Sequence, residues 1–150
     1  MDAYSVLNKH EIIEGLGYRR LRDFKSGKVH LRDCGASGSQ LVVAPDGMVG
    51  PCHSLVGSRT FFSDNVLNDK CDPSQIPTFK EWASRFPLNM GICKGCPFIS
   101  LCGGGCIYNS FISKGTIWDK DPQVCAYMRG MVDWILRYLW KESRMSAKQI

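Results

Sequence analysis

No apolar run in the sequence approaches the roughly 18 residues that a membrane-spanning helix needs. The first residues also lack the apolar core of a secretory signal peptide. We therefore expect a cytoplasmic protein with no membrane partner, and the missing export signal disfavours a secreted disulfide protein. Only one Cys-x-x-Cys pair is present, formed by Cys93 and Cys96. Because structural zinc modules commonly use two such pairs, a zinc-binding interaction module is an alternative and not the first interpretation.

Cysteine itself is abundant, with eight among 150 residues. This density is above ordinary usage, and in a reducing cytoplasm clustered cysteines usually bind metal. The formal net charge is +5. A four-iron four-sulfur cluster with four thiolates carries a charge of roughly −2, so two clusters would offset most of this excess. The basic composition therefore does not indicate a nucleic-acid partner.

The segment Cys93–Cys106 holds four of the cysteines within fourteen residues, and five of the others are glycine or proline. A Cys-x-x-Cys pair aims two sulfurs at one metal centre, and the next five residues let Cys102 fold back onto it. The spacer 103–105 is three glycines, which permit positive φ and a close approach of N–H groups to sulfur. The four cysteines could hold one ion, but iron–sulfur segments of this kind can send the last cysteine to a second cluster.

The length and the 44% hydrophobic content suit a single domain with one modest core. We predict an α+β fold, with a small β-hairpin and cysteine-rich loops around two metal clusters and a long C-terminal helix. The hairpin is expected within Gln40–Cys52, because β-branched apolar residues flank the turn-forming Pro45-Asp46-Gly47. It would bring Cys34 and Cys52 to the same end, where two thiolates supply half a metal site.

Helices are predicted in three places. The first 33 residues contain the helix-compatible segments His10–Glu14 and Tyr18–Phe24, interrupted by Gly15 and Gly17. A capping box of Thr78 and Glu81 predicts a short helix that Pro87 ends, with a core face of Phe79, Trp82, Ala83 and Phe86.

The last helix is expected to begin with Asp121 as N-cap and Pro122 at its first position. Its expected buried face is Val124, Met128, Met131, Val132, Ile135, Leu136 and Leu139. Cys125 lies in the first turn, where N–H groups and the positive end of the helix dipole favour an anionic cluster. A buried, inert cysteine would also suit that position.

The order and spacing of seven cysteines resemble the SPASM domain, the C-terminal auxiliary-cluster domain of radical S-adenosylmethionine (SAM) peptide-modifying enzymes. The resemblance covers about 90 of the 150 residues and rests on Cys34, Gly47-x4-Cys52, Cys93-x2-Cys96-x5-Cys102-x3-Cys106 and Cys125. The sequence around Cys34 and Cys52 is closest to maturases that install thioether or related crosslinks. The resemblance implies one four-iron four-sulfur cluster on Cys34, Cys52 and Cys106. It implies a second on Cys93, Cys96, Cys102 and Cys125.

Two features depart from this family pattern. The fourth ligand of the first cluster is not evident, and Cys71 is either that ligand, a free loop cysteine or a transient redox group. The Cys-x3-Cys-x2-Cys motif that binds the SAM-cleaving cluster is missing. Only Cys102 and Cys106 have three residues between them, and the third cysteine of the motif would then stand at position 109, which is Asn109. We therefore expect residues 1–33 to be the end of an upstream radical SAM barrel, 34–142 the auxiliary domain and 143–150 a polar tail. His53 is expected to be solvated or to support the neighbouring ligand.

The resemblance implies electron transfer and substrate positioning during peptide maturation, with no catalysis by this chain alone. The expected partners are a precursor peptide, the upstream radical SAM domain that would supply SAM, and a redox donor or acceptor protein. The basic run 19–32 is read as a solvated face, with a docking surface for an acidic peptide or domain as the alternative.

Overall fold

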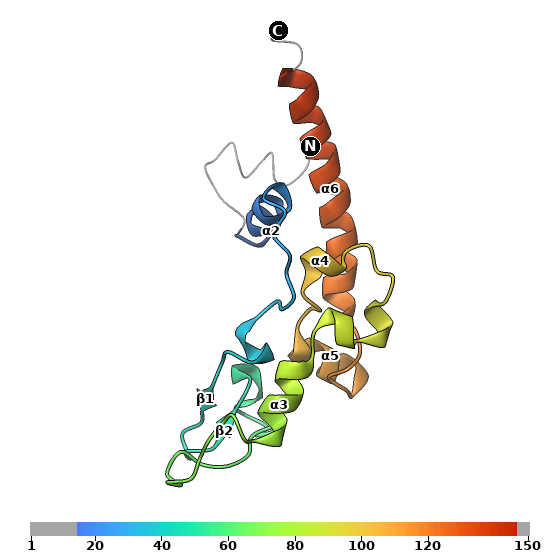
Figure 1. Cartoon of the computed structure of the whole chain (residues 1–150). Coiled ribbons are helices and arrows are strands. Elements are labelled where there is room, and N and C mark those ends of the chain that lie inside the picture. Colours follow the sequence, from blue (N-terminus) through green and yellow to red (C-terminus); the bar gives the residue numbers. More distant parts are fainter. Residues whose placement is uncertain (1–14, 147–150) are drawn as a thin grey trace.

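The computed structural model of the chain describes residues 15–146, which form an α+β fold built along one long helix (Figure 1). A small hairpin and helix α3 lie at one end of the molecule, and helix α2 lies beside the long helix toward the other end. The regular elements are α2 (Gly15–Lys25), β1 (Val42–Val43), β2 (Val49–Gly50), α3 (Pro77–Ser84), α4 (Ile99–Cys102), α5 (Ile107–Lys114) and α6 (Pro122–Ser146). Short 3-10 turns join them: η1 (Gly35–Ser37), η2 (His53–Leu55), η3 (Pro87–Asn89) and η4 (Gly91–Cys93).

The predicted hairpin is confirmed. Strands β1 and β2 pair antiparallel, with Val43 opposite Val49. The Gly47 N–H donates to the Ala44 carbonyl at 2.8 Å, which closes the turn over Pro45 and Asp46. Gly47 has a φ of +83°, a conformation that glycine adopts without a Cβ penalty. The predicted turn chemistry therefore fixed the register of this small sheet.

Two apolar clusters form the core. One surrounds the hairpin end and consists of Ala36, Ala44, Cys52, Leu55, Phe62, Trp82, Ile107 and Ile117. The other joins α2 and α4 to α6 and consists of Leu21, Leu101, Met128 and Ile135, with Cys102 packed against it. The cysteine-bearing loops are therefore anchored on both sides, with one cysteine in or against each cluster.

Helix α3 does not begin with the predicted capping box. It starts at Pro77, and its N-cap residue Ile76 makes no side-chain capping bond. Because Pro77 occupies the first helical position, Thr78 lies one residue inside the helix and is not the cap. The Glu81 carboxylate instead accepts a hydrogen bond from the indole Nε1–H of Trp118 at 2.9 Å. The helix ends at Ser84, so Phe86 lies beyond it.

Helix α6 begins as predicted. The Asp121 Oδ1 atom accepts hydrogen bonds from the N–H groups of Gln123 at 2.9 Å and Val124 at 3.1 Å. Met128 and Ile135 are buried, but Leu136 is 53% exposed, so the predicted buried face was wrong at that residue. The helix continues to Ser146, beyond the start of the expected polar tail.

Helix α2 begins at Gly15 and contains Gly17, so these glycines do not break it as the sequence suggested. The segment His10–Glu14 lies outside the described residues. Lys25 pairs with Glu142 of α6 at 3.0 Å, which fastens α2 to the long helix. No helix among residues 15–146 combines the length and apolar character that crossing a membrane would demand.

Candidate metal-binding site

Three of the cysteines lie together near the hairpin. Cys34 directly precedes η1, Cys52 precedes η2, and Cys106 precedes α5. Burial raises the pKa of the Cys34 thiol, and the negative charges of Cys106 and Cys52 raise it further, while the Ala36 N–H opposes them. We refer to Cys34, Cys52 and Cys106 as the first cysteine group. Segments separated by more than fifty residues thus bring three thiols close enough for their charges to interact.

The other four motif cysteines line a single cavity. Cys93, Cys96, Cys102 and Cys125 surround it together with Gly104, Gly105 and Asp121. Burial raises the pKa of the Cys93 thiol, and the charges of Cys125 and Cys96 raise it further. The enclosed space is about 30 Å³, and a hollow of about 480 Å³ beside it shares Cys96, Cys102 and Cys125 as lining residues. These four residues are the second cysteine group.

The glycine spacer separates the two groups. Gly103, Gly104 and Gly105 all have positive φ, at +72°, +87° and +71°. A Cβ on Gly103 would lie 2.7 Å from the backbone of Arg32, and one on Gly105 would lie 2.8 Å from the Asp121 Cβ. The spacer therefore turns sharply in a tight space, which sends Cys102 and Cys106 into different groups. Burial raises the pKa of Cys102, and a hydrogen bond from the Gly104 N–H lowers it.

Asp121 has a second role that the sequence analysis missed. Besides capping α6, its carboxylate accepts hydrogen bonds through Oδ2 from the Cys106 N–H at 3.2 Å and from Asn109 Nδ2 at 3.1 Å. The side chain is only 1% exposed. It therefore ties a cysteine of the first group to the start of the helix that carries Cys125.

Cys125 lies in the first turn of α6, as expected, but the free N–H groups foreseen there are already occupied. The Cys125 N–H donates to the Asp121 carbonyl at 3.0 Å, and Asp121 Oδ1 caps the two preceding residues. Burial raises the pKa of Cys125, while the charge of Lys120 lowers it. The helix start therefore offers Cys125 no unpaired backbone donor, and the positive charges of Lys120 and Arg129 only partly offset the effect of burial on its pKa.

Cys71 lies apart from both groups. Burial raises the pKa of its thiol, and the carboxylates of Asp64 and Asp72 raise it further. No cysteine is among the charged groups that act on it. His53, beside Cys52, is exposed.

The basic run 19–32 is more than a solvated face. Arg20 is 1% exposed, forms an ion pair with Asp33 and donates to the Cys102 carbonyl at 3.4 Å. Asp33 immediately precedes Cys34. Arg20 of α2 therefore contacts residues next to or within both cysteine groups. Arg22, Lys25 and Lys28, by contrast, are exposed.

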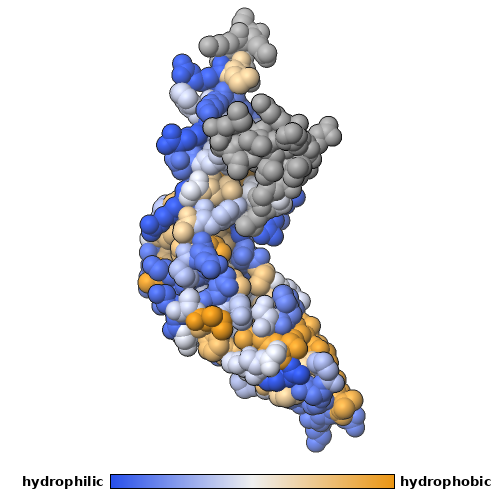
Figure 2. All heavy atoms as spheres, turned by 180° about the vertical axis from the view of Figure 1, so that it is seen from behind, coloured by the Kyte–Doolittle hydropathy of each residue, from blue (hydrophilic) through white to orange (hydrophobic). Residues whose placement is uncertain are grey.

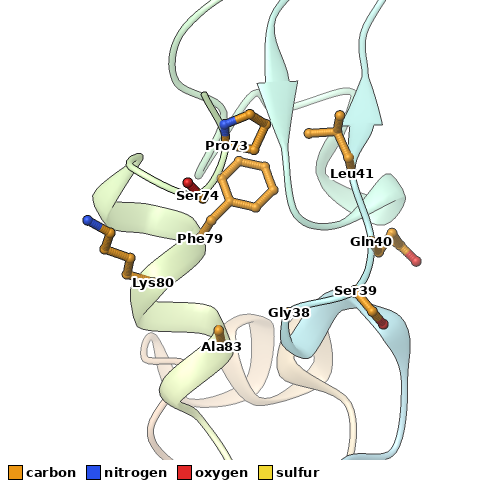
Figure 3. A pocket seen from close by; sticks show the side chains of 9 residues that line it. All are labelled: Gly38, Ser39, Gln40, Leu41, Pro73, Ser74, Phe79, Lys80 and Ala83. Carbon is orange, nitrogen blue, oxygen red and sulfur yellow. The ribbon is translucent and has the colours of Figure 1, made fainter. Parts of the chain in front are cut away.

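A separate surface hollow of about 400 Å³ lies between α3 and the segment that leads into β1. Figure 3 shows Phe79 of α3 beside Pro73, facing across toward the chain at Gly38–Leu41. Figure 2 shows that apolar residues gather toward this end of the molecule, which carries the exposed Leu41, Val43 and Leu67. No cysteine lines this hollow.

The described residues contain no set of three or more His, Cys, Asp or Glu side chains arranged to hold a single metal ion. All eight cysteines are free thiols, so none is withdrawn into a disulfide.

No family model matches the sequence. The chain is similar to the radical SAM cyclopropyl synthase TigE of Paramaledivibacter caminithermalis, with 30% identity over 94 residues. The match covers 63% of this chain and 19% of that enzyme, so the chain corresponds to less than a fifth of its curated relative. This similarity relates the chain to radical SAM enzymes.

Proposed function

We propose that this chain, related to radical SAM enzymes, is an auxiliary iron–sulfur domain of the SPASM type from an enzyme that modifies a ribosomally made peptide. The first cysteine group would hold one four-iron four-sulfur cluster, and the second group would hold another. The fourth iron of the first cluster would either have no protein ligand or be bound by a ligand from outside this group.

The observation that carries this proposal is the division of seven thiols into two groups. Burial and the charges of Cys106 and Cys52 act together on Cys34, whereas Cys93, Cys96, Cys102 and Cys125 line one cavity. The same two sets are the ones that the resemblance to the SPASM domain implies. The arrangement of the thiols and the resemblance therefore support the same ligand assignment.

The donor set fits a polynuclear cluster better than a single ion. Structural zinc sites commonly use two Cys-x-x-Cys pairs around one ion, and the sequence contains only one such pair. A cluster distributes its thiolates over several iron atoms and holds them farther apart. The free thiols and the hollow of about 480 Å³ beside the second group are compatible with such a cofactor.

The chain's own residues would bind and tune the clusters. When bound, such clusters supply one-electron acceptors. The Gly104 N–H that favours the Cys102 thiolate is a hydrogen-bond donor of the kind that adjusts cluster potentials. Because the sequence contains no Cys-x3-Cys-x2-Cys motif, SAM cleavage would belong to another domain, and we expect no turnover by this chain alone.

The surroundings of the second group favour an acidic redox protein as partner. Lys94, Lys120 and Arg129 line the hollow beside Cys96 and Cys125, and all three are exposed. A cluster of like charges around an opening steers an oppositely charged protein toward it. The other partners that we propose are a precursor peptide and a radical SAM domain.

Anaerobic reconstitution with iron and sulfide, followed by quantitation of both, tests the proposal. We expect about eight irons per chain, from two four-iron clusters. Replacement of Cys71 by serine is the matched control, because that thiol lies among carboxylates and should leave the iron content unchanged. A colourless protein that retains stoichiometric zinc, or fewer than about four irons at saturation, would contradict the proposal.

A further inference from the structure

Arg85 is a buried cation for which the fold provides no partner of opposite charge. It follows the last residue of α3 and is 1% exposed. A guanidinium does not lose its proton in proteins, so its charge is buried with it. Burying an ion is costly unless an opposite charge accompanies it.

The hydrogen-bond acceptors of Arg85 are all neutral. Its Nη2 donates to the carbonyls of Gly104 and Asp119, both at 3.1 Å, and to the Ser110 hydroxyl at 2.9 Å. Its Nε donates to the Ile117 carbonyl. None of the ion pairs between described residues includes Arg85. Its Nε and Nη2 atoms are therefore hydrogen-bonded to neutral oxygens, and no carboxylate among the described residues forms an ion pair with it.

These acceptors lie on the segments that connect the two cysteine groups. Gly104 is in the spacer between Cys102 and Cys106. The Ser110 hydroxyl also donates to the Cys106 carbonyl at 3.0 Å. Asp119 lies just before the start of the helix that carries Cys125. The guanidinium is therefore held by atoms of the segments that link Cys102, Cys106 and Cys125 along the chain.

The charges that act on Arg85 also come from both cysteine groups. Burial lowers its pKa, whereas the thiolates of Cys93 and Cys106, followed by Asp121 and the Cys34 thiolate, raise it. Cys93 belongs to the second group, and Cys106 and Cys34 belong to the first. Asp121 is an incomplete counter-ion, because its two oxygens already accept four N–H hydrogen bonds from other residues.

We infer that Arg85 is the shared counter-ion of the two cysteine groups, a positioning residue whose buried charge raises the reduction potentials of both bound clusters. This inference rests on the proposed function. Reduction adds one electron to a cluster without making or breaking a bond, and the cluster becomes more negative by one unit. A fixed positive charge between the clusters stabilises each reduced state. It also lowers the repulsion between two neighbouring anions.

Reductive titration of the reconstituted protein with dithionite, followed by electron paramagnetic resonance, tests this role. In Arg85→Gln we expect both clusters to be harder to reduce, by about tenfold in the equilibrium constant, or about 59 mV for one electron. Arg85→Lys, which keeps the charge, should restore most of the difference. Arg137→Gln is the control, because it removes the same charge from an exposed residue of α6 whose ion-pair partner is Asp133.

Unchanged potentials in a fully loaded Arg85→Gln protein would overturn the inference while leaving the proposed function intact. Failure of the wild-type protein to load two clusters would instead refute the proposed function. If Arg85→Gln loads no iron, the iron content of Arg85→Lys tests whether charge is the important property. Recovery of iron loading in Arg85→Lys supports a role for the charge. A folded Arg85→Lys protein that also loads none contradicts it, because only the forked geometry of arginine would then matter.

Discussion

The Asp121 carboxylate accepts a hydrogen bond from the Cys106 N–H at 3.2 Å while it caps the helix that carries Cys125. These two contacts join elements that belong to different cysteine groups. The spacing of the groups therefore depends on one buried carboxylate as well as on the glycine spacer.

Removal of the Asp121 carboxylate is expected to destabilise the protein. In Asp121→Ala, helix α6 loses its N-cap, which typically costs about 1 kcal/mol. The part-buried Cys106 N–H also loses its acceptor, which adds at most about 1–3 kcal/mol. Urea denaturation of the cofactor-free protein, followed by circular dichroism, measures the sum. Asp133→Ala is the control, because Asp133 forms an exposed pair with Arg137 and should change stability by less than about 1 kcal/mol. Equal effects of the two substitutions would contradict this role for Asp121.

A methyl group on Gly105 is expected to disturb the boundary between the cysteine groups. Gly105 has a φ of +71°, and an added Cβ would lie 2.8 Å from the Asp121 Cβ. Gly115 has the same φ of +71° but open space around it. Both Gly→Ala substitutions carry backbone strain of about 1–2 kcal/mol, so the difference between them isolates the steric clash. We expect Gly105→Ala to unfold at lower urea concentration than Gly115→Ala. Identical midpoints would show that the spacer tolerates the extra atom.

The contact between α2 and the chain that follows it should weaken in acid through Asp23, which is hydrogen-bonded to His30. Burial raises the pKa of this carboxyl, but hydrogen bonds from His30, at 2.5 Å, and Arg22 outweigh it and hold the pKa below its ordinary 3.8. A carboxyl whose pKa is lower in the folded state stabilises the protein above its unfolded pKa. That contribution is lost as the pH falls through the folded pKa.

The stability difference between wild type and Asp23→Asn should therefore shrink as the pH falls below about 4. Urea denaturation of the cofactor-free proteins across this range measures it. Asp46→Asn at the hairpin turn is a useful comparison, because an exposed carboxyl paired with Arg59 should give a smaller difference. A difference that grows in acid would have the wrong sign for this interpretation.

Local chemistry in the sequence predicted some elements well. The Pro45-Asp46-Gly47 turn and the Asp121-Pro122 helix start are confirmed because neighbouring residues alone determine them. The capping box at Thr78 was wrong because the helix starts at Pro77, two residues earlier than a Thr78 cap would place it. Helices α4 and α5 were not predicted, since their sequences are short and have no side-chain caps.

The site was predictable in part for a similar reason. Cysteine spacing alone left open whether Cys106 shares a centre with Cys93, Cys96 and Cys102, and the division into two ligand sets was implied by the resemblance to the SPASM domain. In the structure Cys93, Cys96, Cys102 and Cys125 line one cavity, and the charges of Cys106 and Cys52 act on Cys34. Arg85 and the second contact of Asp121 could not be found in this way. Arg85 belongs to no motif, and its acceptors are mostly backbone atoms 19 to 34 residues away along the chain. Only tertiary packing shows that its charge lies between the groups.

Iron quantitation in variants that each lack one cysteine tests the existence of two separate clusters most directly. We expect reconstituted Cys96→Ser and Cys52→Ser each to keep about four irons, with Mössbauer and electron paramagnetic resonance spectra that differ from one another and together account for the wild-type spectrum. If both variants lose all iron, or if each loses iron evenly with indistinguishable spectra, the seven thiols do not serve two independent centres.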